Sequence, residues 1–441
     1  MLNRFAAALS AAMLALPALA QTPLAPETRD SAVDSLATLI ADEFYDAERA
    51  AEIADNLRGA HAAGAYQQDS AEAFASAVGA DLAEQDNHFS VRYVGAERVA
   101  EAMARREQRR EGGPPSAEEI QRRWAPLARQ NFGFAEVSIL PGNIGYIKLD
   151  QFAPIEPAMD TASAALNFVA NTDGVIFDLR QNGGGHPSMV QFLTSHFLPA
   201  GGDTLINTFV SRDYDYPNQL WSLASHPAGH RPDVPLVVLT SSRSGSAGEA
   251  FPYHLQAMER ATIIGETTYG AGNPGQTFLA EEGFAIFIST GSARNPITGT
   301  NWEGTGVTPD IAVEADDALI EARLHLYAQL AADNEDPGIA NSLSLAIEAL
   351  EAQRNPVELS TRQLRRYAAD WGVRDTFMED GRLYYLREGS NPVALVPLGN
   401  HRFMLEDDDR YRLVFIEGEN GFDRLDLHMP DGRVIANWRV D

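Results

Sequence analysis

The chain has 441 residues, of which 44% are hydrophobic and 22% are charged. This length is typical of about two to four domains, and this composition is typical of a folded globular protein. The 34 basic and 62 acidic residues give a net charge of −28, which argues against nucleic acid or an anionic membrane surface as the main partner. The chain has no cysteine, which excludes disulfides, thiolate nucleophiles and cysteine-ligated metal sites.

Residues 1–20 have the three parts of a secretory signal peptide. Arg4 precedes an apolar run at 5–20, and Ala18-Leu19-Ala20 is a small-residue cleavage site. The alternative is a membrane anchor, but the run is short for a bilayer and contains a proline. The sequence therefore predicts a periplasmic or secreted protein that is not inserted in a membrane once the signal is removed.

Residues 21–130 have the pattern of a helical domain. Apolar residues recur at helical spacing at 35–40 and at 71–82. The arginine-rich stretch at 105–123 is interleaved with glutamates, which favours solvated helix faces over a nucleic-acid site.

Residues 131–315 alternate between short apolar strands and helices, a pattern typical of an α/β core with a mostly buried sheet. The expected strands are 145–150, 175–179, 235–240, 262–265 and 285–289. The expected helices are 157–171, 187–198 and 248–260.

Two further segments follow this core. Residues 316–355 have a helical pattern and are predicted to form a linker. The pattern of residues 356–441 predicts short strands. Asp380-Gly381 and Asp431-Gly432 are dipeptides typical of hairpin turns. We therefore expect a small C-terminal antiparallel β domain.

Two turns in the core carry residues suited to catalysis. At 240–249, a strand ends in small residues that include Ser246, and a helix follows, an arrangement that can present a nucleophile. An N-cap serine in a polar turn is the alternative. At 174–185, a buried strand ends in Asn182 and three glycines, a turn that can present backbone N–H groups to an oxyanion. A flexible loop is the alternative there, and the spacing matches neither a dinucleotide nor an ATP motif.

Taken in order, these motifs resemble the C-terminal-processing (tail-specific) serine proteases. The similarity is carried by DLRQNGGG at 178–185, SGSAGEAF at 244–251, GETTYG at 265–270 and NWEGTG at 301–306. It is greatest to the branch with the tricorn protease core and interphotoreceptor retinoid-binding protein. The fold that this resemblance implies is a ClpP/crotonase-like ββα catalytic core. The charged, helical stretch between the upstream motif at 86–93 and the core is too short for the PDZ module of many members.

The resemblance also implies catalytic residues. The family nucleophile matches Ser246, and the oxyanion donors match the N–H groups of Ala247 and of Gly183 or Gly184. The position of the family's catalytic lysine is Ala271, and the only lysine in the chain is Lys148, in a predicted strand.

Histidine is then the natural base at neutral pH, and ten are present. The tricorn-like branch implies His88 as the base and Glu303 as the carboxylate that orients it. His186, which follows the glycine turn, is the rival base or a substrate-binding residue.

The sequence and its resemblance to these proteases therefore predict a peptidase that hydrolyses peptide bonds through an acyl-enzyme on Ser246. We expect a peptide or protein substrate, no cofactor and no metal. His226 and His230 have the helical spacing of metal ligands, but the Pro and Gly between them favour a loop. The alternatives are a peptide- or hydrophobic-ligand-binding protein on a protease-like core, and an esterase. An α/β-hydrolase is disfavoured because position 244 is serine where its motif needs glycine. The oligomeric state is not indicated.

Overall fold

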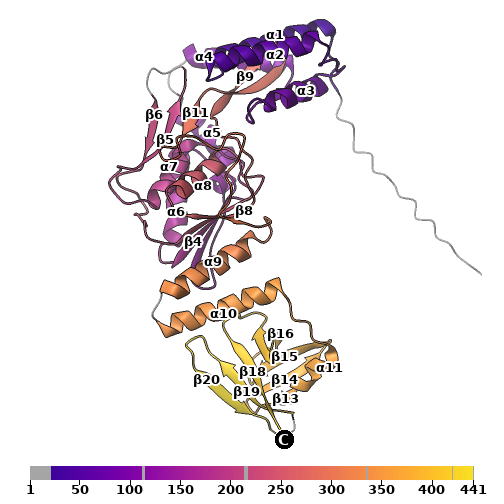
Figure 1. Cartoon of the computed structure of the whole chain (residues 1–441), viewed down its shortest axis with the longest axis vertical. Helices are drawn as coiled ribbons and strands as arrows, with labels where there is room; N and C mark the ends of the chain where they lie inside the picture. Colours follow the sequence, from indigo (N-terminus) through magenta and orange to yellow (C-terminus); the bar gives the residue numbers. More distant parts are fainter. Residues whose placement is uncertain (1–20, 112–114, 213–216, 334–335, 420, 441) are drawn as a thin grey trace, which may run out of the picture. The chain divides into compact units, whose positions relative to one another are not determined.

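The computed structural model describes residues 21–111, 115–212, 217–333, 336–419 and 421–440 (Figure 1). The predicted signal peptide at 1–20 lies outside these residues. The chain divides into two compact units. The first comprises residues 1–115, 209–218 and 271–293, and the second comprises 116–208, 219–270 and 294–441. The domain boundaries expected from the sequence stay predictions.

The first unit packs helices against a small antiparallel sheet. Its helices are α1 (Pro26–Glu43), α2 (Ala47–Ala62), α3 (Ala71–Ala83) and α4 (Ala96–Glu111). Its sheet has the order β1-β10-β9 and is formed by β1 (Ser90–Tyr93), β10 (Phe284–Ser289) and β9 (Gly275–Ala280). Phe74 of α3 packs edge-on against Phe284 of β10, with 5.2 Å between ring centroids. The strand expected at 285–289 thus forms, but it pairs with β1 and β9 and not with the strands of the α/β core.

The second unit is built on a six-stranded sheet with the order β12-β8-β7-β4-β3-β2. Its strands are β2 (Phe134–Leu140), β3 (Ile144–Leu149), β4 (Gly174–Asp178), β7 (Leu236–Thr240), β8 (Thr262–Gly265) and β12 (Ile311–Ala312). All neighbouring pairs are parallel except β2 with β3. The α/β class expected from the sequence is confirmed.

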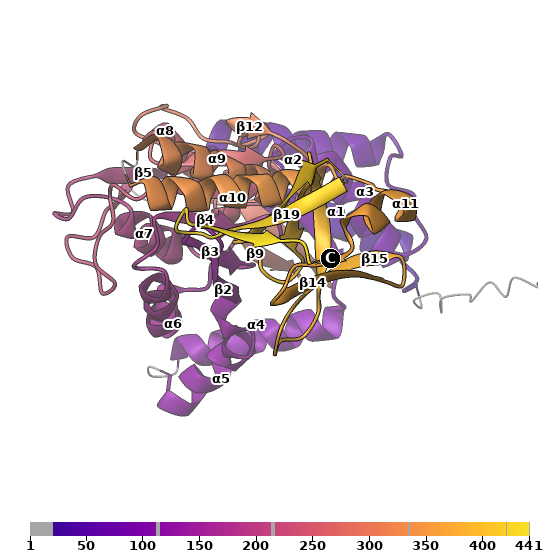
Figure 2. The ribbon, with the colours of Figure 1, turned by 90° about the horizontal axis from the view of Figure 1, so that it is seen from below.

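Helices cover both faces of this sheet, so its four inner strands are buried almost throughout, whereas the edge strands β2 and β12 are partly exposed. One face packs on α6 (Ile155–Phe168), α7 (Pro187–His196) and α8 (Ala247–Ala257). The other face packs on α9 (Ala318–Asp333) and α10 (Pro337–Arg354), which run side by side in Figures 1 and 2. The segment predicted as a helical linker therefore forms two helices that complete the core.

Shorter elements connect these layers. Helix α5 (Ala117–Ala128) and a 3₁₀ turn, η1 (Asn131–Gly133), precede β2. A three-stranded sheet with the order β11-β5-β6 is formed by β5 (Leu205–Val210), β6 (Asn218–Trp221) and β11 (Ser292–Arg294).

The C-terminal part is an antiparallel sheet in which each strand pairs with the next along the chain, which confirms the predicted β domain. Helix α11 (Thr361–Leu364) and the 3₁₀ turn η2 (Arg365–Tyr367) lead into it. The strands are β13 (Ala369–Asp370), β14 (Arg374–Glu379), β15 (Arg382–Arg387), β16 (Val393–Gly399), β17 (Arg402–Leu405), β18 (Arg412–Gly418), β19 (Gly421–His428) and β20 (Val434–Trp438). Asp380 and Gly381 both have positive φ (47° and 82°), as the tight turn predicted between β14 and β15 requires.

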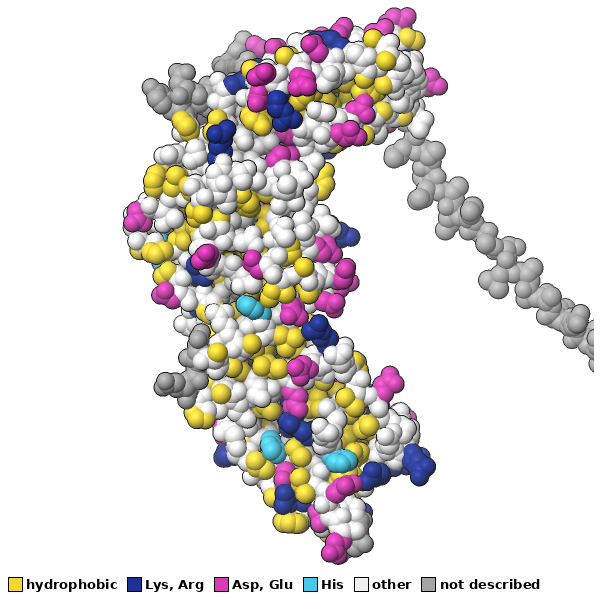
Figure 3. Space-filling model, in the orientation of Figure 1, with side chains coloured by type: hydrophobic (Ala, Val, Ile, Leu, Met, Phe, Trp, Pro, Cys, Tyr) yellow, Lys and Arg dark blue, Asp and Glu magenta, His cyan; other side chains and the backbone are white. Residues whose placement is uncertain are grey.

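No helix among the described residues is long and apolar enough to cross a membrane. Acidic side chains are scattered over the face of the molecule drawn in Figure 3 and do not gather in one place.

Candidate active site

Ser246 lies on a strained turn between β7 and α8. Its φ of 54° and ψ of −119° fall where a residue with a side chain is disfavoured. Ser241 Oγ donates to the carbonyl of Arg180 at 2.6 Å, and Ser244 Oγ donates to that of Leu179 at 2.8 Å. These bonds fasten the turn to the segment that follows β4. The small-residue turn predicted from the sequence thus places Ser246 at the start of a helix.

The glycine turn after β4 packs directly against Ser246. Asn182 is fully buried, and its Nδ2 donates to the carbonyl of Leu149 at 2.7 Å. Its backbone carbonyl accepts from the N–H of Gly245 at 3.0 Å. A Cβ added at Gly184 would lie 2.8 Å from the Cβ of Ser246, and φ there is +116°, so the position requires glycine.

Two backbone N–H groups of these turns have no acceptor among the residues that the structure describes. The N–H of Gly184 is taken by Asn182 Oδ1 at 2.9 Å. The N–H groups of Gly183 and Ala247 donate no hydrogen bond to any other residue that the structure describes. A Cβ on Gly184 would lie 3.3 Å from the nitrogen of Ala247, which shows how closely the two segments approach. Of the two glycines predicted from the sequence, Gly183 is therefore the one with an available donor.

A buried glutamate, Glu249, holds the Ser246 turn in place. It is fully buried, and its Oε2 accepts from the backbone N–H of Ser246 at 2.7 Å. Its Oε1 accepts from Thr268 Oγ and from the N–H of Gly270, each at 2.6 Å. A carboxylate is suited to this place because it accepts from several donors at once.

The same network reaches the loop that carries Glu303. Thr268 Oγ accepts from the N–H of Val307 at 2.7 Å, and the N–H of Gly304 donates to the carbonyl of Gly270 at 2.9 Å. Glu303 itself is half-buried, and its N–H donates to Asn301 Oδ1 at 2.9 Å. The second unit therefore connects Ser246 to the Glu303 loop through Glu249 and Thr268.

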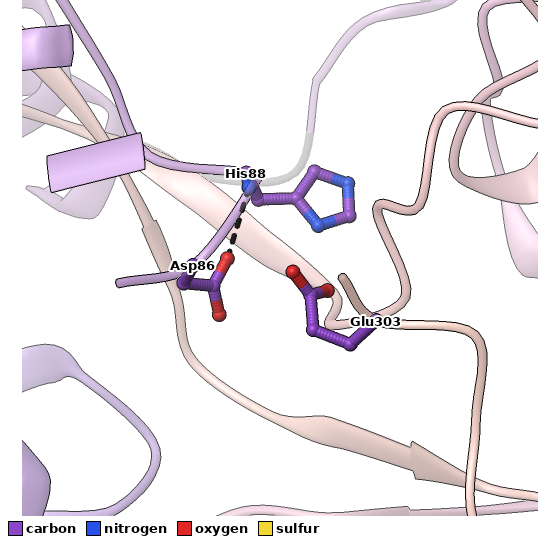
Figure 4. Close-up of side chains that lie close together, drawn as sticks. All are labelled: Asp86, His88 and Glu303. Carbon is purple, nitrogen blue, oxygen red and sulfur yellow. Dashed lines mark hydrogen bonds between the residues drawn. The ribbon is translucent and has the colours of Figure 1, made fainter. Parts of the chain in front are cut away.

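His88 belongs to the first unit, in the turn before β1. Its N–H donates to Asp86 Oδ1 at 2.9 Å (Figure 4). Asp86 is buried and also accepts from Ser289 Oγ and Asn273 Nδ2, each at 3.0 Å. Burial lowers the pKa of His88 below its ordinary value, and the negative charge of Asp86 opposes this shift. Burial thus favours the neutral imidazole, the form that accepts a proton.

The structure also gives the places of the other candidates from the sequence. His186 caps α7, where its Nδ1 accepts from the N–H of Ser188 at 3.2 Å. Lys148 lies on β3 between Glu136 of β2 and Asp178 of β4. His226 and His230 lie in the loop before β7, as the Pro and Gly between them indicate.

Three residues of the site were not assigned by sequence reasoning: Asn182, Glu249 and Asp86. Each stands next to a predicted residue in a quoted motif. Only Glu249 carries a signal in the sequence, because it is a charged residue among small and apolar ones and must find partners when it is buried. Asp86 and Asn182 follow other polar residues, and their burial is seen only in the structure.

Comparisons with known proteins agree with these motifs. Residues 143–313 match the model of peptidase family S41. A carboxy-terminal-processing protease of Bartonella bacilliformis is 32% identical over 179 residues, which are 39% of this chain and 39% of that protein. A carboxyl-terminal-processing protease of Synechocystis is 31% identical over 179 residues, covering 40% of this chain and 39% of that protein. The similarity thus spans about two fifths of the length of these relatives.

Among solved structures, a putative peptidase from Parabacteroides merdae is similar with a TM-score of 0.44 and 20% identity. That similarity covers 69% of this chain and 96% of the other.

Proposed function

We propose that this chain, whose residues 143–313 match the model of peptidase family S41, is an exported serine peptidase that forms an acyl-enzyme on Ser246. One observation carries the proposal: Ser246 is held at positive φ at a helix start, and the N–H groups of Ala247 and Gly183 in the same two turns have no acceptor in the described part of the chain. A nucleophile on a strained turn, next to donors that can hold a developing negative charge, is the arrangement that acyl transfer needs.

The proposed mechanism follows from these groups. Ser246 Oγ attacks the peptide carbonyl carbon while His88 takes the hydroxyl proton. The carbonyl oxygen becomes an oxyanion that accepts from the N–H groups of Ala247 and Gly183. The intermediate then collapses, the C–N bond breaks, and His88 returns the proton to the leaving amine. Water, deprotonated by the same histidine, hydrolyses the ester.

The choice of His88 as the base and Glu303 as its orienting carboxylate belongs to this proposal. Burial supports His88 because it keeps the imidazole neutral near pH 7. His186 is the weaker choice, since its Nδ1 already accepts from the backbone at the start of α7.

Hydrolysis of a peptide library tests the proposal. Replacement of Ser246 by Ala is expected to lower the rate by about 10⁴- to 10⁶-fold with the far-ultraviolet circular dichroism unchanged, because the nucleophile is lost and the backbone is kept. His88→Ala is expected to cause a comparable loss, whereas His186→Ala keeps most of the rate. A Ser246→Ala protein that still cleaves peptides would contradict Ser246 as the nucleophile. A loss of the hydrolysis rate in His186→Ala but not in His88→Ala would identify His186 as the base.

Export is proposed from the signal-like segment at 1–20. The protein recovered from the periplasm or medium of an expressing Gram-negative host is expected to begin at Gln21, as read by N-terminal sequencing. A protein that stays in the cytoplasm with residues 1–20 attached would contradict export.

A further inference from the structure

A cavity of about 480 Å³ lies beside the glycine turn of the second unit. Gly183, Gly184 and Gly185 form part of its lining, together with Asp150 and Gln151. Gly184 also contacts the Ser246 turn, since a Cβ on it would lie 2.8 Å from the Cβ of Ser246. One wall of the cavity is therefore the turn that packs against Ser246, and the cavity volume is in the range of small-ligand sites.

Asp150 is half-buried and is the only charged residue in the part of the cavity lining that the structure describes. Its Oδ1 is buried, yet it accepts no hydrogen bond from the residues that the structure describes. Its backbone is fixed at the end of β3, where its N–H donates to the carbonyl of Gly133 at 2.8 Å. Because Oδ1 is covered by the protein, a ligand in the cavity reaches the carboxylate through Oδ2, which accepts no hydrogen bond from the described residues either. A cationic donor there would form a charge-assisted hydrogen bond.

The rest of the lining leaves the charge of Asp150 uncompensated. The other lining residues that the structure describes are glycines, Ala135 and the amides Gln130 and Gln151, none of which carries a charge. The cavity thus combines space, a single negative charge and a position beside the glycine turn that packs against Ser246.

We propose that this cavity binds a cationic nitrogen group of the peptide substrate, an ammonium or a guanidinium, through Asp150. This inference rests on the proposed peptidase function and adds a substrate class to it. The group is either the side chain of a Lys or Arg close to the scissile bond or the free N-terminal ammonium of a short peptide. Asp150 accepts the donor and is a specificity-determining residue, while the bond-breaking steps stay with Ser246.

Matched peptides test the proposal through kcat/KM. One set carries Lys, Arg, norleucine or Glu at each position next to the scissile bond, and each peptide is made with a free and with an acetylated N-terminus. Asp150→Asn is expected to lower kcat/KM about 10- to 100-fold for cationic peptides and to leave norleucine peptides nearly unchanged, because a charge-assisted hydrogen bond is lost.

The two sources of the cation give different results. A preference that survives acetylation identifies the side chain, and one that acetylation abolishes identifies the N-terminus. The control is Asp160→Asn, which removes an exposed carboxylate from α6 that does not line the cavity. The absence of any preference for cationic peptides, or an equal loss for norleucine peptides in Asp150→Asn, would overturn the proposal.

A binding measurement separates this inference from the peptidase function. A fluorescent Lys-containing peptide is titrated into the Ser246→Ala protein and into the Ser246→Ala, Asp150→Asn double variant, and anisotropy is recorded. Weaker binding to the double variant supports the cavity even if hydrolysis is never observed. Equal affinity for both proteins contradicts the cavity even if Ser246 proves to be the nucleophile.

Discussion

The Ser246 turn and the His88 turn hold the proposed nucleophile and the proposed base in the same way. In each turn, the backbone N–H of that residue donates to a buried carboxylate close in sequence. Ser246 donates to Glu249 at 2.7 Å, and His88 donates to Asp86 at 2.9 Å. Glu249 is fully buried and Asp86 is 4% exposed, so neither carboxylate can replace a lost partner with bulk water easily.

The two turns differ in where the remaining partners come from. Glu249 takes its other donors from Thr268 and Gly270, 19 and 21 residues along the chain. Asp86 takes its other donors from Asn273 and Ser289, 187 and 203 residues away. The Ser246 turn is therefore fixed by a local stretch of chain, whereas the His88 turn depends on a segment that returns to the first unit much later.

The largest effect is expected at Glu249. An amide in Glu249→Gln has one acceptor oxygen, so either Ser246 or the Thr268 and Gly270 pair loses its acceptor. The unfolding free energy is expected to fall by about 2–4 kcal/mol. The kcat/KM for peptides is expected to fall about 100-fold, because the nucleophile shifts. Urea unfolding and peptide kinetics measure the two effects.

The matched control for Glu249 is Glu259→Gln, just beyond the end of α8, where the side chain is exposed. It is expected to change neither quantity. Equal behaviour of the two variants would show that Glu249 does not hold the turn.

A smaller effect is expected at Asp86, and it concerns pH. The proposed base must be neutral, so activity is lost as pH falls through the pKa of His88. Burial places that pKa below its ordinary value of about 6.5, and Asp86 raises it. Removing the charge in Asp86→Asn should therefore lower the pKa further. The acid limb of the kcat/KM profile is expected to move to lower pH, with a lower rate at pH 7–8.

Ser289→Ala is the control for Asp86, because it removes one donor from the carboxylate and keeps the charge. Its acid limb should stay much closer to that of the unmodified protein. An acid limb in Asp86→Asn that stays in place or moves to higher pH would break the comparison between the two turns.

The smallest effect is expected from the backbone strain at Ser246. Both Ser246→Gly and Ser246→Ala remove the nucleophile, but only glycine adopts a φ of 54° and a ψ of −119° without strain. The glycine variant is expected to be more stable than the alanine variant by about 1 kcal/mol in urea unfolding. An alanine variant that is the more stable of the two would mean that the turn stores no strain.

Features fixed by contacts close in sequence are predicted well from the sequence, and features fixed by distant contacts are not. Four strands of the six-stranded sheet, β3, β4, β7 and β8, and the Ser246 turn follow from local patterns, and their bounds agree with the expected ones to within one residue. The edge strands β2 and β12 are not among the strands that the sequence predicts. The pairing of β10 with β1 is not predicted either, because Phe284–Ser289 has the apolar pattern of any buried strand and its partner lies far away in sequence. The sequence also does not tell which of Gly183 and Gly184 has a free backbone N–H. That depends on the hydrogen bond that the N–H of Gly184 donates to Asn182 Oδ1, and the spacing of the motif does not predict this bond.

One measurement tests the central claim directly: labelling of the protein with a fluorophosphonate, followed by mass spectrometry of its peptides. An activated serine reacts with this probe, whereas an ordinary hydroxyl does not. We expect one adduct, on Ser246. The adduct should be absent from Ser246→Ala and kept in Ser242→Ala, which removes an exposed serine of the same turn. An unlabelled protein, or an adduct on any other residue, would contradict the account.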